Sequence, residues 1–162
     1  MNLRVKQLVA DIFQQRPWLG RIAHRVWRRF QARFSAGAVG VVFDPDGNIL
    51  LLKHVYRPHY QWGLPGGYVG RREDPAQTVQ RELLEETGLQ VTVIRPLWVE
   101  QGMYADHLDL AYLCRLDGGD VRLSSEILAY AWVSPHRLPQ LLDFHRRVVN
   151  LALQDQEVST WQ

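Results

Sequence analysis

Hydrophobic residues recur at every fourth position between residues 17 and 34, and arginines occupy many of the positions between them. That spacing places the hydrophobic residues on one side of an α-helix. Pro17 fits the first turn of such a helix. The pattern predicts a basic amphipathic helix, whose apolar side holds Trp18, Ile22, Val26, Phe30 and Phe34 and whose basic side holds Arg21, Arg25, Arg28 and Arg29.

After residue 36 the period shortens, and runs rich in leucine and β-branched residues alternate with turn residues. The segment 44–48, Asp-Pro-Asp-Gly-Asn, has the chemistry of a tight turn, which predicts a hairpin around it. Strands are expected near 37–43, 49–56, 90–101, 107–116 and 128–134, a short helix from Pro135, and a final amphipathic helix over 143–154. Strands on both sides of a central helix predict an α/β protein with a mixed sheet covered by helices.

The central helix is strongly acidic. Asp74 suits its N-cap, and Gly88 suits the left-handed residue that ends it. Glu82, Glu85 and Glu86 stand at i, i+3 and i+4 and therefore share one face, where like charges repel by about 0.2–0.5 kcal/mol per pair. A divalent cation would neutralise them, because carboxylate oxygens are the ligands that Mg²⁺ and Mn²⁺ prefer. From spacing alone, an exposed acidic face is the alternative interpretation.

Composition narrows the class of protein. The 162 residues, 46% of them hydrophobic, suit one domain or one domain with an appendage. A single cysteine excludes an intrachain disulfide, and no apolar run reaches the ~20 residues of a membrane span, so a cytoplasmic protein is expected. Residues 1–35 hold eight of the 19 Lys and Arg but one of the 17 Asp and Glu, which defines a basic leader before a mildly acidic body.

The acidic helix and the loop before it match the Nudix box position for position: Gly, five residues, Glu, seven residues, then Arg-Glu-apolar-any-Glu-Glu-any-Gly-apolar. The matching residues are Gly67, Glu73, Arg81, Glu82, Leu83, Glu85, Glu86, Gly88 and Leu89. The chain therefore resembles the Nudix hydrolases, and the likeness spans roughly residues 36–142. It implies a Nudix-type α/β/α sandwich with a mixed sheet over residues 36–162, preceded by the helical leader of residues 1–35.

The resemblance also implies an activity. Nudix hydrolases cleave a nucleoside diphosphate linked to another moiety, with Mg²⁺ or Mn²⁺, and the substrate here would be a nucleotide-derived small molecule. The implied metal ligands are Glu82, Glu85, Glu86 and the carbonyl of Gly66, with Glu82 as a ligand or as the base. Arg81 would hold a glutamate of the box in place. Glu126 is the candidate acid from outside the box, and Glu100 is its competitor.

Substrate contacts are harder to assign. Aromatic and basic residues in segments that border the implied cleft are Tyr56, Arg57, Tyr60, Trp62, Tyr68, Tyr104 and His107. An aromatic ring can stack on a base, and an arginine can pair with a phosphate. Arg57, Trp62, Tyr68 and Tyr104 are the predicted substrate-binding residues, with structural packing as the alternative for each.

The basic leader permits three interpretations. It packs its apolar side on the domain or on a second subunit, as in a homodimer; it lies on an anionic membrane surface, at the inner face of the membrane; or it binds RNA through phosphate contacts. A Nudix-fold binding module that acts through the leader is the alternative to an enzyme. The complete set of glutamates argues against that alternative.

Overall fold

The computed structural model describes residues 3, 7, 13–56, 59 and 61–159. It divides into two compact units, Met1–Arg33 and Phe34–Gln162. The second unit contains a mixed sheet of seven strands: β1 (Ser35–Phe43), β2 (Ile49–His54), β3 (Trp62–Gly63), β4 (Gly66–Tyr68), β5 (Gln90–Gln101), β6 (His107–Gly118) and β7 (Ile127–Val133).

The strands of this sheet run in the order β3-β2-β1-β6-β5, with β4 paired to β1 and β7 paired to β2. Only the β1–β6 pair is parallel among these pairs. The five strands expected from the sequence are therefore present, and the expected mixed sheet is confirmed. Strands β3 and β4 lie in the Gly/Pro-rich segment before the acidic helix, where the sequence predicted no strand. Backbone pairing with sequence-distant strands forms them, since Gly66–Tyr68 pairs with Gly37–Val39.

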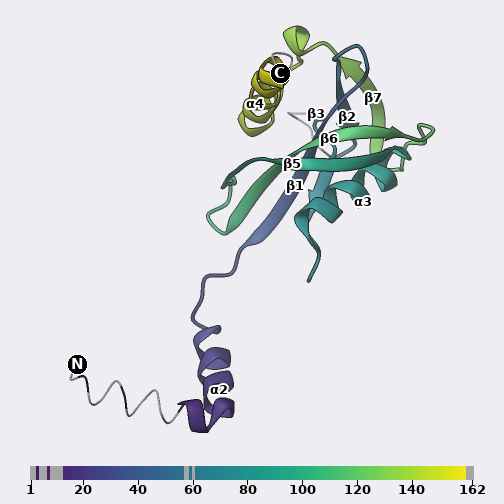
Figure 1. Cartoon of the computed structure of the whole chain (residues 1–162). Coiled ribbons are helices and arrows are strands. Elements are labelled where there is room, and N and C mark those ends of the chain that lie inside the picture. Colours follow the sequence, from purple (N-terminus) through teal and green to yellow (C-terminus); the bar gives the residue numbers. More distant parts are fainter. Residues whose placement is uncertain (1–2, 4–6, 8–12, 57–58, 60, 160–162) are drawn as a thin grey trace. The chain divides into compact units, whose positions relative to one another are not determined.

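Two helices cover opposite faces of the sheet, α3 (Pro75–Thr87) and α4 (Asp143–Ser159), as Figure 1 shows. Alternation along β1 and β2 serves both layers, because successive side chains of a strand point to opposite faces. Val42 and Leu50 belong to the hydrophobic cluster that contains Leu83 of α3. Val41 and Leu51 belong to the cluster that contains α4. The α/β/α layering expected for this unit is thus observed.

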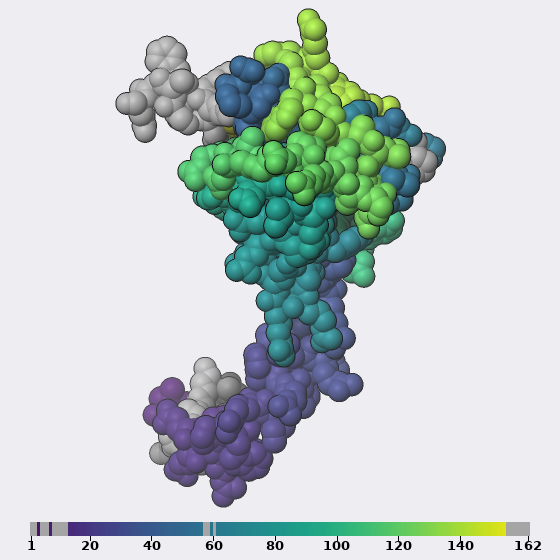
Figure 2. Space-filling view, turned by 90° about the vertical axis from the view of Figure 1, so that its right-hand side faces the viewer, coloured from purple at the N-terminus to yellow at the C-terminus, as the bar shows by residue number. Residues whose placement is uncertain are grey.

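In the first unit the leader forms α2 (Pro17–Trp27), with Pro17 in its first turn. The apolar pattern continues to Phe34, but the α-helix ends at Trp27 and turns follow. No residue of α2 is buried, so its side chains lie at the surface of this unit, purple in Figure 2. Within the part of the chain that the structure describes, no helix has the length and apolar character needed to cross a membrane.

The short helix expected from Pro135 is a single 3₁₀ turn, η1 (Pro135–Arg137), and Ser134 stands at its N-cap without a side-chain hydrogen bond. The final helix α4 begins at Asp143, as expected.

Candidate active site

Local sequence positions the acidic helix α3. The Asp74 carboxylate accepts a hydrogen bond from the Ala76 N–H at 2.8 Å, and Pro75 occupies the first turn. Gly88 ends the helix with φ 76°, a left-handed conformation that only glycine adopts without strain. Both ends predicted from the sequence are confirmed. The burial of Val79 and Leu83 against the sheet then fixes the rotation of the helix, and with it the direction of each glutamate.

Glu86 is the buried member of the acidic face, with 6% of its surface exposed. Its Oε2 accepts a hydrogen bond from the Gly66 N–H at 3.1 Å, and its Oε1 lies 3.9 Å from Nδ1 of the buried His54. Gly66 has φ 146°, and a side chain there would overlap the β1 backbone at Ala38. Only glycine therefore fits at this position and brings its N–H to the Glu86 carboxylate.

Glu82 lies beside the next residue of the same strand. A Cβ atom at Gly67 would overlap the Glu82 carboxyl group, so the carboxylate packs directly on the β4 backbone. The Glu82 side chain is 19% exposed. Two carboxylates of α3 thus meet the backbone of the adjacent residues Gly66 and Gly67.

Arg81 organises the rest of the acidic face. Its Nε donates to Glu73 Oε1 at 2.8 Å, and its Nη2 donates to Glu73 Oε2 at 3.2 Å. Its Nη1 donates to Glu82 Oε1 at 2.7 Å and to Glu85 Oε2 at 3.0 Å. One guanidinium therefore holds three carboxylates of the box, which suits its planar fork of donors.

These bonds shift the pKa values of Glu73 and Arg81. The Arg81 hydrogen bond, reinforced by the Gly70 N–H, lowers the pKa of Glu73 to about 2. The bond to Glu73, with further contributions from Glu82 and Glu85, raises the pKa of Arg81. Glu73 and Arg81 are consequently both charged at neutral pH, and their ion pair ties the loop before the helix to the middle of the helix.

The donors of this site suit a hard divalent cation, since they are carboxylate oxygens beside a backbone free of side chains. Among the described residues, however, no three acidic, histidine or cysteine side chains surround a common point closely enough to hold a metal ion. Arg81 directs Glu82 and Glu85, whereas Glu86 faces Gly66. The chemistry of the donors therefore fits, and a cation would compete with Arg81 for oxygens of Glu82 and Glu85.

The two acids outside the box differ in surroundings. Glu126 is exposed and directly precedes β7, and its carbonyl accepts a hydrogen bond from Val55 just after the buried His54. That contact places it near the His54–Glu86 end of the site. Glu100 instead pairs with Arg147 of α4 and accepts a hydrogen bond from Trp98.

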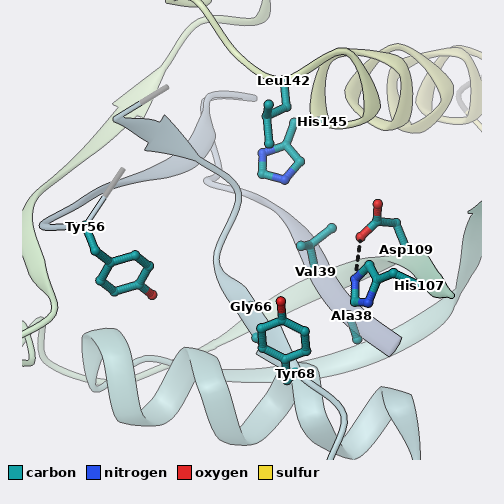
Figure 3. Close-up of a pocket in the computed structure, with 11 residues that line it drawn as sticks. Ala38, Val39, Tyr56, Gly66, Tyr68, His107, Asp109, Leu142 and His145 are labelled. Atoms are coloured by element: carbon teal, nitrogen blue, oxygen red, sulfur yellow. Dashed lines mark ion pairs between the residues drawn. The ribbon is translucent and has the colours of Figure 1, made fainter. Parts of the chain in front are cut away.

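A cavity of about 300 Å³ borders the glutamates, because Gly66 and Gly67 also line it. Tyr68 lies on this cavity, as do Tyr56 and His107 (Figure 3). Trp62 packs against the hydrophobic cluster that contains α4, and Tyr104 is exposed; neither lines the cavity. Arg57 and Tyr60 fall outside the described residues. Substrate contacts by these residues stay predictions.

Sequence reasoning passed over three polar residues of the site. Asp109 and His145 line the cavity, and His54 faces Glu86. Asp109 could have been predicted from the sequence, because it follows His107 by two residues in a predicted strand and so lies on the same face of that strand. His54 and His145 could not, since each occupies an ordinary position in an apolar strand or helix.

Comparison with known proteins shows the family to which the chain belongs. The family model described as NUDIX domain matches residues 33–152. The chain is 33% identical over 106 residues to a MutT-like protein of Streptomyces ambofaciens, an alignment that covers 65% of this chain and 68% of that protein.

Two further matches carry more specific names. An ADP-ribose pyrophosphatase of Methanocaldococcus jannaschii is 28% identical over 119 residues, with 70% of each chain covered. The crystal structure of a MutT NUDIX hydrolase from Burkholderia pseudomallei has a TM-score of 0.62 and 29% identity, and the match covers 74% of this chain and 98% of that one.

Proposed function

The chain belongs to the Nudix hydrolase family, and from that premise we propose that Glu82, Glu85 and Glu86 hold Mg²⁺ or Mn²⁺ for hydrolysis of a nucleoside diphosphate derivative. Enzymes of this family generally depend on a divalent cation. The observation that carries the proposal is the nearly buried Glu86 carboxylate, held by the Gly66 N–H next to Glu82. Burying an ionised carboxylate is unfavourable unless hydrogen bonds or a cation compensate.

Each residue of the site has a role in this proposal. Glu86 and Glu85 are metal ligands, and Glu82 is a ligand or the base that takes a proton from the attacking water. The Gly66 carbonyl completes the ligand set. A bound divalent cation neutralises the carboxylates and stabilises the charge that develops on the phosphoryl oxygens.

Other groups orient these ligands. Arg81 fixes the rotamers of Glu82 and Glu85, and Glu73 anchors Arg81 to the loop before the helix. Glu126 contributes an acid from outside the box. Water attacks phosphorus in the diphosphate linkage, and a nucleoside monophosphate and a phosphorylated remainder leave.

A panel of nucleotide derivatives with Mg²⁺ or Mn²⁺ tests this proposal, with nucleoside monophosphate release as the readout. The panel contains ADP-ribose, nucleotide sugars, oxidised nucleoside triphosphates, dinucleoside polyphosphates and capped RNA. We expect turnover of at least one class, and its loss with excess EDTA. Absence of turnover across the panel, together with absence of metal uptake in titration calorimetry, would remove the enzyme and leave only the fold.

The leader supports a second, separate proposal: α2 docks on an anionic membrane surface and makes the enzyme peripheral to it. Trp18, Ile22 and Trp27 are each about half exposed, and Arg21 and Arg25 lie between them along the helix. Large aromatic residues beside arginines suit the bilayer interface, whereas binding to RNA needs only the charges.

Co-sedimentation with phosphatidylglycerol vesicles tests the docking. We expect binding at low salt that weakens as salt rises, and its loss when Arg21, Arg25 and Arg28 are replaced by Gln in the full chain. Replacing Arg122, Arg137 and Arg146, which are exposed in the second unit, removes the same charge and should leave binding unchanged. Three outcomes would overturn the membrane assignment: binding to phosphatidylcholine vesicles but not to phosphatidylglycerol vesicles, binding to RNA but not to vesicles, or no vesicle binding at low salt.

A further inference from the structure

The cavity beside the glutamates has a floor made by three adjacent strands. Gly37 of β1 stands opposite Tyr68 of β4 on one side and opposite Asp109 of β6 on the other. Because Gly37 has no side chain, the His107 ring and the Asp109 carboxylate fit beside it. Helix α4 closes the top of the cavity with His145, as Figure 3 shows.

Asp109 is held in this cavity by a short relay. Its Oδ1 lies 3.2 Å from His107 Nε2, and His107 Nδ1 lies 2.8 Å from the Ser35 hydroxyl. The hydroxyl also donates to the Asp106 carbonyl at 3.2 Å. Tyr68 packs edge-on against the His107 ring, with 5.4 Å between ring centroids. Both side chains line the cavity, and Asp109, which is 27% exposed, is more accessible there than His107, which is 11% exposed.

Two glycines make room for the relay. A Cβ atom at Gly37 would come within 3.2 Å of His107 Nε2, and one at Gly102 would come within 2.7 Å of Asp109 Oδ2 and of His107 Cδ2. Contacts that tight would displace both side chains. The fold therefore leaves space on two sides for a carboxylate and an imidazole at this position.

The chemistry of the cavity limits what it can bind. A volume of about 300 Å³ lies at the small end of ligand pockets and suits a nucleoside-sized group. The Asp109 carboxylate accepts hydrogen bonds and donates none, and its charge repels phosphate. The diphosphate of a substrate is thereby directed away from Asp109, and Gly66 and Gly67, which the cavity shares with the glutamates, mark the direction in which it would run.

We propose that Asp109 is a specificity-determining residue, which accepts hydrogen bonds from hydroxyl or N–H groups of the nucleoside in the substrate. His107 is a positioning residue: it orients the carboxylate and is itself oriented by Ser35. This inference rests on the proposed function, since it assigns the nucleoside end of the same substrate to the cavity. Tyr68 and Tyr56 flank the space and provide ring faces for a planar group.

Kinetics of Asp109→Ala, with the best substrate of the panel, test this assignment. We expect KM to rise about 10- to 100-fold, as for loss of hydrogen bonds to a charged group, while kcat changes less than about threefold. The KM of Asp109→Asn should lie between those of the unaltered chain and Asp109→Ala, because the amide keeps one acceptor oxygen. The matched control is Asp117→Asn on the same strand, whose carboxylate binds Arg115 and Thr92 away from the cavity. An unchanged KM in Asp109→Ala would overturn the proposal.

Binding of nucleoside monophosphates gives a readout that does not need turnover. Three pairs separate the sources of the donor: GMP against IMP and AMP against purine riboside monophosphate for base amino groups, and AMP against 2′,3′-dideoxy-AMP for sugar hydroxyls. In titration calorimetry we expect the protein to favour the donor-bearing member of at least one pair about tenfold, and Asp109→Ala to abolish that preference. A preference that survives in Asp109→Ala, or no preference in any pair, would refute the role of Asp109.

These outcomes also keep the two proposals apart. Loss of the proposed function would appear as absence of metal uptake and turnover in the unaltered chain, whatever happens at Asp109. Failure of the specificity assignment would appear as normal turnover and metal uptake with no change in KM in Asp109→Ala. His107→Gln should raise KM less than Asp109→Ala does, since the carboxylate itself remains.

Discussion

Helices α2 and α3 have similar sequence patterns but differ in their capping and burial in the structure. Both are amphipathic, and both carry a set of like charges beside an apolar side. α3 has a side-chain N-cap, a left-handed glycine at its end and five buried residues, one of them Glu86. α2 has no side-chain cap and no buried residue. The acidic face of α3 forms a candidate site because the backbone of Gly66 and Gly67 meets it, whereas the basic face of α2 lies at the surface.

The largest expected difference between the two helices is the loss of unfolding free energy caused by an alanine substitution on the apolar side of each. Leu83→Ala on α3 removes a fully buried side chain and is expected to reduce the free energy of unfolding by 2–5 kcal/mol. Ile22→Ala on α2 is the matched change on a half-exposed residue, and it should stay within about 0.5 kcal/mol. Urea denaturation measures both. A large effect of Ile22→Ala would mean that the apolar side of α2 is packed in solution.

Catalysis should separate the carboxylates of α3 from the charges of α2. Glu86→Gln keeps an acceptor for the Gly66 N–H but removes the charge, so we expect kcat to fall roughly 100- to 1,000-fold with the fold retained. Circular dichroism checks the fold, and titration calorimetry checks the metal affinity. Asp46→Asn in the exposed β1–β2 turn is the carboxyl-to-amide control. Full activity in Glu86→Gln would show that the metal lies on other carboxylates.

Capping gives a smaller test of the same comparison. Asp74→Ala removes the hydrogen bond to the Ala76 N–H and should lower the free energy of unfolding by about 1 kcal/mol. Asp74→Asn keeps an acceptor oxygen and should recover most of the loss. Urea denaturation of the three proteins makes the measurement. Equal stability of Asp74→Ala and the unaltered chain would show that the tertiary contacts of α3 alone hold its first turn.

The smallest expected effect is the pH dependence of the stability that ionised Glu73 contributes. The pKa of Glu73 is lowered from 4.5 to about 2 by Arg81 and the Gly70 N–H, so its ionised form stabilises the folded state above pH 4.5. That contribution shrinks as pH falls through the interval and is lost near pH 2. Thermal midpoints of Glu73→Gln and of the unaltered chain, compared across pH, should therefore differ at neutral pH and converge in acid. A constant difference would mean that the stability gained from this site does not depend on the Glu73 charge.

Most of the helices and strands, and the acidic face of α3, could be predicted from the amino-acid sequence alone. The N-cap at Asp74, the Gly88 stop and the spacing of Glu82, Glu85 and Glu86 are local features, which depend on residues within a few positions of one another. The runs rich in leucine and β-branched residues on either side of the 44–48 turn likewise predicted the hairpin of β1 and β2. Such local features can be predicted from the amino-acid sequence because backbone geometry repeats over short distances.

Which of those residues come into contact depends on the tertiary structure. Glu86 is distinguished from Glu85 by the Gly66 N–H, which comes from 20 residues away, and Asp109 reaches the cavity because β6 lies parallel to β1. The order of strands in a sheet depends on long-range packing, and no local pattern encodes it. The acidic face could therefore be predicted from the sequence. Its burial, its Arg81 network and the cavity beside it arise from the way distant segments pack together.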